Sequence, residues 1–284
     1  MPSLRDIRTR IASVKSTRQI TSAMKMVAAA KMRRAVENAT NARPYQETLT
    51  GTLQRVAAGA GDIENPLLTP HATVKTVCIV VVGTERGLCG GFNANLNRKV
   101  EEAYRRLTAE GKTVQLRTFG KKPRDYFKNR KMTNDPTVGV GPKQFLEAVP
   151  PLSESITAAF AAGEVDEVWL AYNSFKSTLT QVPTLKRILP LSIDTTGAVG
   201  ADFLYEPEGA GILATLLPLY LRTLLLQAFL EMDAGEQAAR MTAMDSATRN
   251  ASDLIDRLTL EYNRSRQASI TKELIEIISG AEAL

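Results

Sequence analysis

Residues 241–270 read MTAMDSATRNASDLIDRLTLEYNRSRQASI and belong to a stretch, Leu213 to Ile278, in which Pro218 and Gly235 are the only proline and glycine. At about 1.5 Å per residue, a continuous helix over this stretch is roughly 100 Å long, too long for one small globular core. Alternating spacings of three and four residues within it form the a/d seam of a coiled coil. This seam consists of Met241, Met244, Thr248, Ala251, Ile255, Leu258, Tyr262, Ser265 and Ser269. Because many of these side chains are small or polar, we expect a second helix to approach closely and part of the surface to face another partner.

The N-terminal segment is predicted to supply the second helix. Ser3 and Asp6 form a helix start, and apolar residues then recur at a spacing of four and three. The seam is expected to use Ile7, Ile11 and Val14, then Ile20, Met24 and Val27 on a slightly drifted face, and then a stripe of Ala28, Ala35, Ala39 and Ala42.

Charge also favours pairing of the two ends of the chain. Between Asp6 and Glu37, the N-terminal helix carries eight basic residues and no acid, whereas the C-terminal helix is rich in acids. Exposed ion pairs each contribute little, so the charge supports the pairing without deciding it. We therefore expect an antiparallel coiled coil of the two termini, with the rest of the chain inserted into it. The basic residues are Arg8, Arg10, Lys15, Arg18, Lys25, Lys31, Arg33 and Arg34.

Composition places few further limits on the protein. With 284 residues, 44% hydrophobic and 23% charged, the chain suits one or two ordinary domains. Its net charge of +6 points to an acidic partner surface. Cys78 and Cys89 are the only cysteines, so no disulfide framework is expected. The sequence contains no run of about 18 uninterrupted apolar residues, so it predicts no membrane-spanning helix.

The middle of the chain changes from helical to strand periodicity. The continuous apolar run Thr76–Val82 is typical of a strand buried on both faces of a parallel sheet, and strands then alternate with helices. The fold class is therefore α/β with the long coiled coil, the inserted domain being Rossmann-like. The predicted limits are 1–57 for the N-terminal helix, 58–73 for a linker, 74–206 for the α/β domain and 207–284 for the C-terminal helix. His71, in the linker, is expected to be a solvent-facing loop residue.

The glycine-rich loop after the first strand, Gly83–Gly91, is the main candidate for chemistry. Its glycines fit neither a dinucleotide fingerprint nor a P-loop, and the sequence contains no nucleophile elbow, zinc-protease motif or Cys/His cluster. We interpret these glycines as serving tight turns and close packing, and we predict no catalytic, cofactor or metal site. The basic run Lys121–Lys131 is interpreted as a solvated helix face that could also contact headgroups or an acidic protein.

Three segments together resemble the gamma subunit family of F-type ATP synthases of the bacterial type. Residues 20–32 (ITSAMKMVAAAKM) are similar to that family's first helix, residues 85–93 (ERGLCGGFN) to its glycine loop, and residues 265–281 (SRQASITKELIEIISGA) to its C-terminal signature. The resemblance implies a non-catalytic rotor shaft, one copy per complex, inside a hexamer of alpha and beta subunits. Its foot would bind epsilon and the c ring at the cytoplasmic face of the bacterial inner membrane. The initiator Met1 and the lack of a presequence favour a bacterial chain over a mitochondrial precursor.

The resemblance also implies contact residues. Those toward alpha and beta are Met24, Lys25, Lys31, Arg33, Arg34, Arg240, Arg266, Gln267 and Thr271. Those toward epsilon and the c ring are Phe203, Tyr205 and Glu206. Residues Ile270 to Leu284 extend past the reach of the N-terminal helix, so their apolar face is expected to meet the sleeve as a single helix.

Two other classes of function remain open at this point. A basic coiled coil that binds nucleic acid through Arg8–Arg34 predicts binding that weakens steeply with salt. A nucleotide-dependent enzyme using the loop Gly83–Gly91 predicts saturable binding of ATP or NAD by the isolated chain. Neither explains why the basic helix has its mate at the opposite end of the chain.

Overall fold

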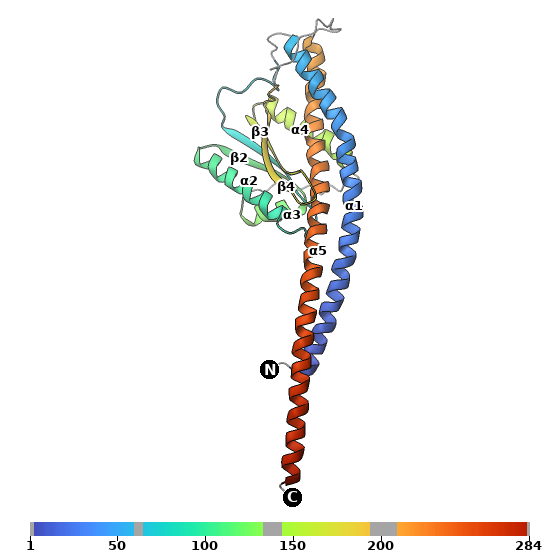
Figure 1. Ribbon diagram of the computed structural model, residues 1–284. Helices are drawn as coiled ribbons and strands as arrows, with labels where there is room; N and C mark the ends of the chain where they lie inside the picture. Colours follow the sequence, from blue (N-terminus) through green and yellow to red (C-terminus); the bar gives the residue numbers. More distant parts are fainter. Residues whose placement is uncertain (1–2, 60–64, 133–143, 194–208, 283–284) are drawn as a thin grey trace. The chain divides into compact units, whose positions relative to one another are not determined.

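The computed structural model describes residues 3–59, 65–132, 144–193 and 209–282 (Figure 1). The chain divides into two compact units, Met1–Ala29 with Arg240–Leu284, and Ala30–Ala239. The two long helices contribute to both units. The elements in chain order are α1 (Leu4–Gly59), β1 (Thr76–Val82), α2 (Phe92–Ala109), β2 (Thr113–Phe119), α3 (Lys121–Asn129), α4 (Phe145–Ala161), β3 (Glu167–Phe175), β4 (Gln181–Leu189) and α5 (Gly209–Glu282).

The larger unit is built on a four-stranded sheet of order β2-β1-β3-β4. The central strand β1 pairs in parallel with β2 and with β3, and β4 closes one edge antiparallel to β3. The predicted α/β class with a largely parallel sheet is confirmed. Pro150 and Pro151 lie inside α4, although two consecutive prolines in a sequence normally predict the end of a helix.

The two faces of β1 explain its continuous apolar sequence. Cys78, Val80 and Val82 face a core that contains residues of α4 and α5, whereas Val77, Ile79 and Val81 face a second core with residues of α2 and α3. All six side chains are at most 1% exposed. A strand covered on both faces needs no polar alternation, as the sequence predicted.

The leucine-rich start of α5 belongs to this core. Leu213, Leu217, Leu221 and Leu225 have no exposed surface in the protein. By length and composition alone, the stretch Gly211–Ser279 passes as a membrane-crossing helix, a test that core helices also pass. Burial of its leucines identifies this part of α5 as the support of the sheet.

At Gly235, α5 packs closely against α2 and β4. A Cβ atom at this position would lie 2.8 Å from Cε2 of Phe92 and 3.3 Å from Cγ of Gln181. Because Phe92 is buried, Gly235→Ala is expected to lower the free energy of unfolding by about 1 kcal/mol despite alanine's better helix propensity. Chemical denaturation of the full chain measures this change.

Gly51 in α1 is the matched control for Gly235, because a Cβ atom there would meet nothing within 4 Å. Gly51→Ala is therefore expected to raise stability by up to about 1 kcal/mol. Combining Gly235→Ala with Phe92→Leu should lower the free energy of unfolding by less than the sum of the two single losses. Equal stabilisation by both glycine replacements would contradict the close packing of α5 at Gly235.

In the smaller unit, the segments of α1 and α5 run antiparallel, since Thr21 contacts Thr248 and Lys25 contacts Asp245. The α5 seam is confirmed: Met244, Ala251, Ile255 and Leu258 are buried, and Met241, Thr248, Tyr262, Ser265 and Ser269 are half-buried. The paired helices thus form the predicted coiled coil.

The predicted seam of α1 is partly wrong. Ile20 and Val27 are 57% and 55% exposed, whereas Thr21 and Ala28 are buried. Together with the buried Ile7 and the half-buried Val14, these small residues keep a strict seven-residue spacing. The helix therefore follows the heptad period and leaves the larger apolar side chains outside, because small residues permit closer contact between backbones.

Candidate functional site

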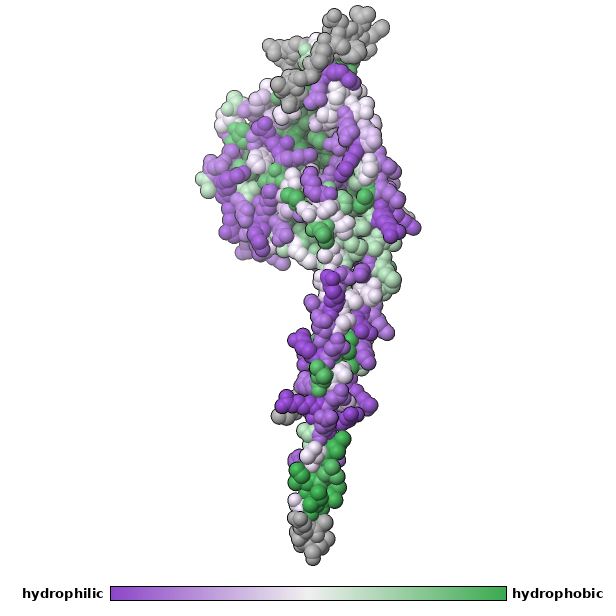
Figure 2. Space-filling view, viewed as in Figure 1, coloured by the Kyte–Doolittle hydropathy of each residue, from purple (hydrophilic) through white to green (hydrophobic). Residues whose placement is uncertain are grey.

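An exposed apolar surface distinguishes the smaller unit. On the last turns of α5, Ile270, Leu274, Ile275, Ile277 and Ile278 are each at least 50% exposed. Figure 2 shows this surface as a green region near the C-terminal end of α5. An apolar surface of this extent indicates a site of contact with another molecule. The expectation that the tail extends as a single helix beyond the reach of α1 is confirmed.

A second set of exposed apolar side chains was not recognised from the sequence as surface. Met26 is 66% exposed on α1 and Leu260 is 71% exposed on α5, in addition to Ile20 and Val27. The available signal was an excess of apolar residues over the number that one heptad seam can bury. Within the smaller unit, these side chains extend the candidate contact surface beyond the tail of α5.

The predicted contact residues of α1 differ in their surroundings. Met24 is half-buried, whereas Lys31, Arg33 and Arg34 are exposed. Lys25 is committed to an internal ion pair, with its Nζ 2.6 Å from Oδ1 of Asp245. Its side chain is nevertheless 45% exposed, so the ammonium group also remains accessible from outside.

The predicted contact residues of α5 fall into two separate places. Arg266, Gln267 and Thr271 are exposed on neighbouring turns, and Thr271 donates its hydroxyl to the carbonyl of Gln267 at 3.0 Å. Arg240 is only 9% exposed, although the sequence placed it at a partner surface. Since 26 residues of helix span about 39 Å, Arg240 and Arg266 cannot share one contact. The predicted residues Phe203, Tyr205 and Glu206 lie outside the described residues.

Side chains in the glycine loop and just after it form hydrogen bonds with one another and with the loop backbone. The buried hydroxyl of Thr84 donates to the carbonyl of Arg86 at 2.6 Å and accepts from the amide of Asn93 at 2.8 Å. The same amide lies 3.2 Å from Sγ of the buried Cys89. Where the loop begins, a Cβ at Gly83 would lie 2.8 Å from the ring of Pro123. Close packing, which the sequence predicted, accounts for the glycine at this position.

His71 is not the solvent-facing residue that the sequence predicted. Its Nδ1 lies 2.8 Å from Oδ1 of Asp166, and its ring stacks on Phe160 with centroids 4.7 Å apart. Asp166 also accepts the backbone N–H groups of Lys75 and Thr76 at 2.7 and 2.8 Å. The pair therefore fastens the start of β1. Among the described residues, no three His, Cys, Asp or Glu side chains are placed to share a metal ion.

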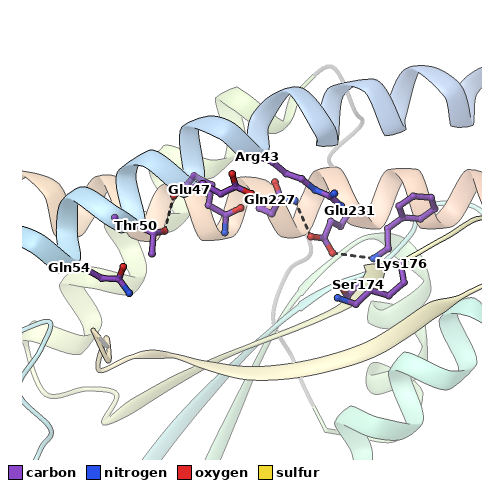
Figure 3. A pocket seen from close by; sticks show the side chains of 11 residues that line it. Arg43, Glu47, Thr50, Gln54, Ser174, Lys176, Gln227 and Glu231 are labelled. Atoms are coloured by element: carbon purple, nitrogen blue, oxygen red, sulfur yellow. Dashed lines mark hydrogen bonds between the residues drawn. The ribbon is translucent and has the colours of Figure 1, made fainter. Parts of the chain in front are cut away.

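A polar cleft of about 680 Å³ lies between α1, the end of β3 and α5 (Figure 3). In its wall, Glu231 accepts the side-chain amide of Gln227 at 2.9 Å and the backbone N–H of Phe175 at 3.1 Å. Burial and then the charge of Glu231 raise the pKa of the nearby Tyr172 to about 12. Both carboxylate oxygens of Glu231 are therefore occupied, one by Gln227 within α5 and the other by the backbone of Phe175, which ties α5 to β3. The cleft is lined by Arg43, Gln46, Glu47, Thr50, Gly51, Gln54, Ser174, Phe175, Lys176, Gln227 and Glu231.

Comparison with known proteins gives one consistent family. The family model described as ATP synthase matches residues 3–284. The ATP synthase gamma chain of Hyphomonas neptunium is 48% identical over 292 residues and that of Pelotomaculum thermopropionicum 45% identical over 287, with 100% of both chains covered in each case.

Solved structures agree with this result at the level of the fold. A chain of the Euglena gracilis mitochondrial ATP synthase, described as OSCP/F1/c-ring in rotational state 3, matches with a TM-score of 0.72 at 22% identity and covers 99% of this chain and 94% of that chain. A chain of the Tetrahymena thermophila mitochondrial ATP synthase, described as central stalk/c-ring, matches with a TM-score of 0.60 at 24% identity, covering 80% and 99%.

Proposed function

The chain belongs to the ATP synthase gamma chain family, and we propose that it is the central rotor shaft of an F-type ATP synthase. In this role it couples proton-driven rotation of a membrane c ring to ATP synthesis in an alpha/beta hexamer. The observation that carries the proposal is the tail of α5, which is helical and displays Ile270, Leu274 and Ile277 without a partner from α1. A single helix with this apolar surface is suited to lie inside a sleeve formed by other subunits.

The mechanism follows from stiffness and asymmetry rather than from bond-making. Two paired helices resist bending more than one, so torque applied at one end reaches the other. Because one chain occupies the centre of a hexamer, its surface is different toward each catalytic subunit. Rotation then brings each nucleotide site in turn against a different part of the shaft and changes its affinity. The chain itself is proposed to be non-catalytic and to bind no cofactor.

Exposed polar side chains supply the proposed contacts with the sleeve. Met24, Lys25, Lys31, Arg33 and Arg34 are proposed to face acidic segments of beta, with Lys25 accessible while paired to Asp245. Arg266, Gln267 and Thr271 are proposed to contact alpha and beta, supported by their exposure on α5. Arg240 is proposed to contribute to the same function although it is buried within the chain.

The remaining proposals concern the contacts with epsilon and the c ring, the location of the complex and the domain limits of the chain. Phe203, Tyr205 and Glu206 are proposed to lie near epsilon and the c ring. The complex would hold one copy of this chain, attached peripherally to the cytoplasmic face of the bacterial inner membrane through the c ring. The proposed domain limits are residues 57, 73 and 206, and limited proteolysis would test them by cleavage at those positions.

Reconstitution tests the shaft directly. The chain is mixed with alpha and beta subunits, separated by size exclusion and assayed for ATPase activity. We expect co-elution with the hexamer, and we expect Arg266→Ala with Gln267→Ala to change turnover at least about threefold, because two exposed contacts are lost. Glu102→Ala with Thr108→Ala, an exposed polar pair on α2, is the matched control. A folded chain that fails to assemble with alpha and beta subunits would reject the shaft.

A further inference from the structure

The buried seam of the coiled coil in the smaller unit mixes large apolar side chains, such as Ile7, Ile255 and Leu258, with small ones. The small ones include Thr21, Ala28 and Ala251. Such small side chains repeat every seven residues and make similar contacts in several registers. In the observed register Ile7 lies opposite Tyr262, and a shift of one heptad in one direction places it opposite another apolar residue, Ile255. Apolar burial alone therefore discriminates poorly against that shift, whereas the opposite shift would place Ile7 opposite Ser269.

Two polar contacts cross between the helices in the middle of this segment. The hydroxyl oxygens of Thr21 and Thr248 lie 2.8 Å apart, so that one hydroxyl donates to the other. One turn further along α1, the ammonium of Lys25 donates to Oδ1 of Asp245 at 2.6 Å. Thr21 is only 8% exposed. Its hydrogen bond is therefore shielded from water, which would otherwise compete for it.

Asp245 is held from both sides. Its second oxygen, Oδ2, lies 3.0 Å from Nη2 of Arg249, one turn further along α5. The hydrogen bond from Lys25 lowers the pKa of Asp245, and the charge of Arg249 acts in the same direction. The carboxylate is thus fixed on its own helix by Arg249 and presents its other oxygen to Lys25 on α1.

The two contacts are specific to one register. A shift of one heptad would place Thr21 opposite Met241 or Ile255, neither of which can replace the hydroxyl of Thr248. The shift that brings Ile7 opposite Ile255 would place Lys25 opposite Ala238 and Asp245 opposite Arg18, so that a different ion pair would replace the observed one. The opposite shift would place Lys25 opposite Ser252 and leave Asp245 without a basic partner on α1. In either shifted register, the hydroxyls of Thr21 and Thr248 would keep their contacts with the carbonyls of Arg18 and Met244 on their own helices, at 3.1 and 2.7 Å, and would lose the hydrogen bond that joins the two helices.

We propose that Thr21, Thr248, Lys25 and Asp245 form a polar clamp that fixes the axial register of the paired helices in the smaller unit. These are positioning residues, which act on the helices and not on a reacting group. The clamp is a property of this chain alone and does not depend on the proposed shaft function. In a shaft, the same clamp would oppose sliding of one helix along the other when torque is applied.

Charge reversal in the full chain tests the clamp, with hydrogen–deuterium exchange of α1 residues 5–28 as the readout. Lys25→Glu alone places two carboxylates together and is expected to raise the exchange rate of this segment about fivefold, as for loss of a partly exposed ion pair. Reversing all three charges, with Lys25→Glu, Asp245→Lys and Arg249→Asp, is expected to restore most of the protection. Lys15→Glu and Asp253→Lys change exposed charges on the same two helices and serve as controls.

A second variant separates the clamp from general helix stability. Thr21→Val removes the hydroxyl but keeps the branched shape, so it is expected to raise exchange across residues 5–28 by about threefold to tenfold. Exchange in peptides of the sheet, such as β1, should remain at the wild-type rate. The clamp is rejected if Lys25→Glu and Thr21→Val both exchange like the wild type, or if the triple reversal is no better protected than Lys25→Glu.

Discussion

Gly120→Ala is expected to lower the free energy of unfolding of the sheet-containing unit by at least about 3 kcal/mol, a large fraction of the roughly 5–15 kcal/mol that stabilises a typical domain. Gly120 follows β2 and has φ of +94° and ψ of 141°, a conformation that side chains disfavour. A Cβ atom there would lie 2.5 Å from the carbonyl oxygen of Gly83 and 2.9 Å from the carbonyl carbon of Thr84. Backbone atoms cannot rotate away as a side chain can, so the ends of β1 and β2 would have to separate.

Gly111 provides the matched control for this prediction. It also has a positive φ, of +80°, but a Cβ atom there would meet nothing within 4 Å. Gly111→Ala therefore measures backbone strain alone and is expected to cost about 1 kcal/mol. Urea denaturation of both variants, followed by the fluorescence of Trp169, gives the comparison. Equal losses for the two variants would mean that the close approach of Gly120 to Gly83 carries no energetic weight.

The sequence was a good guide where one local signal determined an element. The continuous apolar run Thr76–Val82 predicted a strand with both faces covered, and β1 has the same limits. The spacing of Met244, Ala251 and Ile255 predicted the α5 seam because a coiled coil repeats one local geometry. In both cases, a regular pattern within one short segment of sequence predicted which of its side chains are buried.

The sequence was a poor guide where the partner is distant or where size conflicts with spacing. Ile20 and Val27 were assigned to the α1 seam because they are apolar, whereas the heptad period selects Thr21 and Ala28. His71 was expected to face solvent because its partner, Asp166, lies 95 residues later in the chain. No periodic pattern links residues so far apart.

The candidate contact surface could be predicted only in part. The resemblance to a family supplied Arg266 and Gln267, and both are exposed on α5. The exposed side chains of Met26 and Leu260 were missed because hydropathy alone assigns such residues to a core. Surfaces that meet other subunits carry the composition of a core without being buried in their own chain, so only the structure distinguishes the two.

Asp166→Ala is expected to lower the free energy of unfolding of the sheet-containing unit by about 2–4 kcal/mol. The carboxylate accepts the backbone N–H groups of Lys75 and Thr76 and pairs with His71. Its side chain is only 12% exposed, so water cannot fully replace it for the N–H groups it leaves behind. The N–H group of Thr76 is partly buried, and a buried N–H group without a partner costs about 1–3 kcal/mol, whereas the N–H group of Lys75 is exposed and loses less. His71→Ala keeps both backbone contacts of Asp166 and should cost clearly less, which makes it the control.

The contribution of Asp166 should also depend on pH in a defined direction. Burial raises the pKa of its carboxyl group, but the hydrogen bonds from the Thr76 N–H, from His71 and from the Lys75 N–H outweigh burial and lower the pKa below its usual value. Because the folded-state pKa lies below the unfolded value of about 3.9, the stabilisation is fully present above that value and is lost as the pH falls through the folded pKa.

Denaturation of the wild type and of Asp166→Asn at pH 7, 4 and 3 measures this dependence. Asparagine keeps the size of the side chain but does not ionise, so the difference in stability between the two proteins should be largest at pH 7 and should shrink at pH 3. The other carboxyl groups titrate in both proteins and cancel in the difference. A difference that stays constant from pH 7 to pH 3 would show that the charge of Asp166 does not hold the start of β1, and that its shape and hydrogen bonds alone are sufficient.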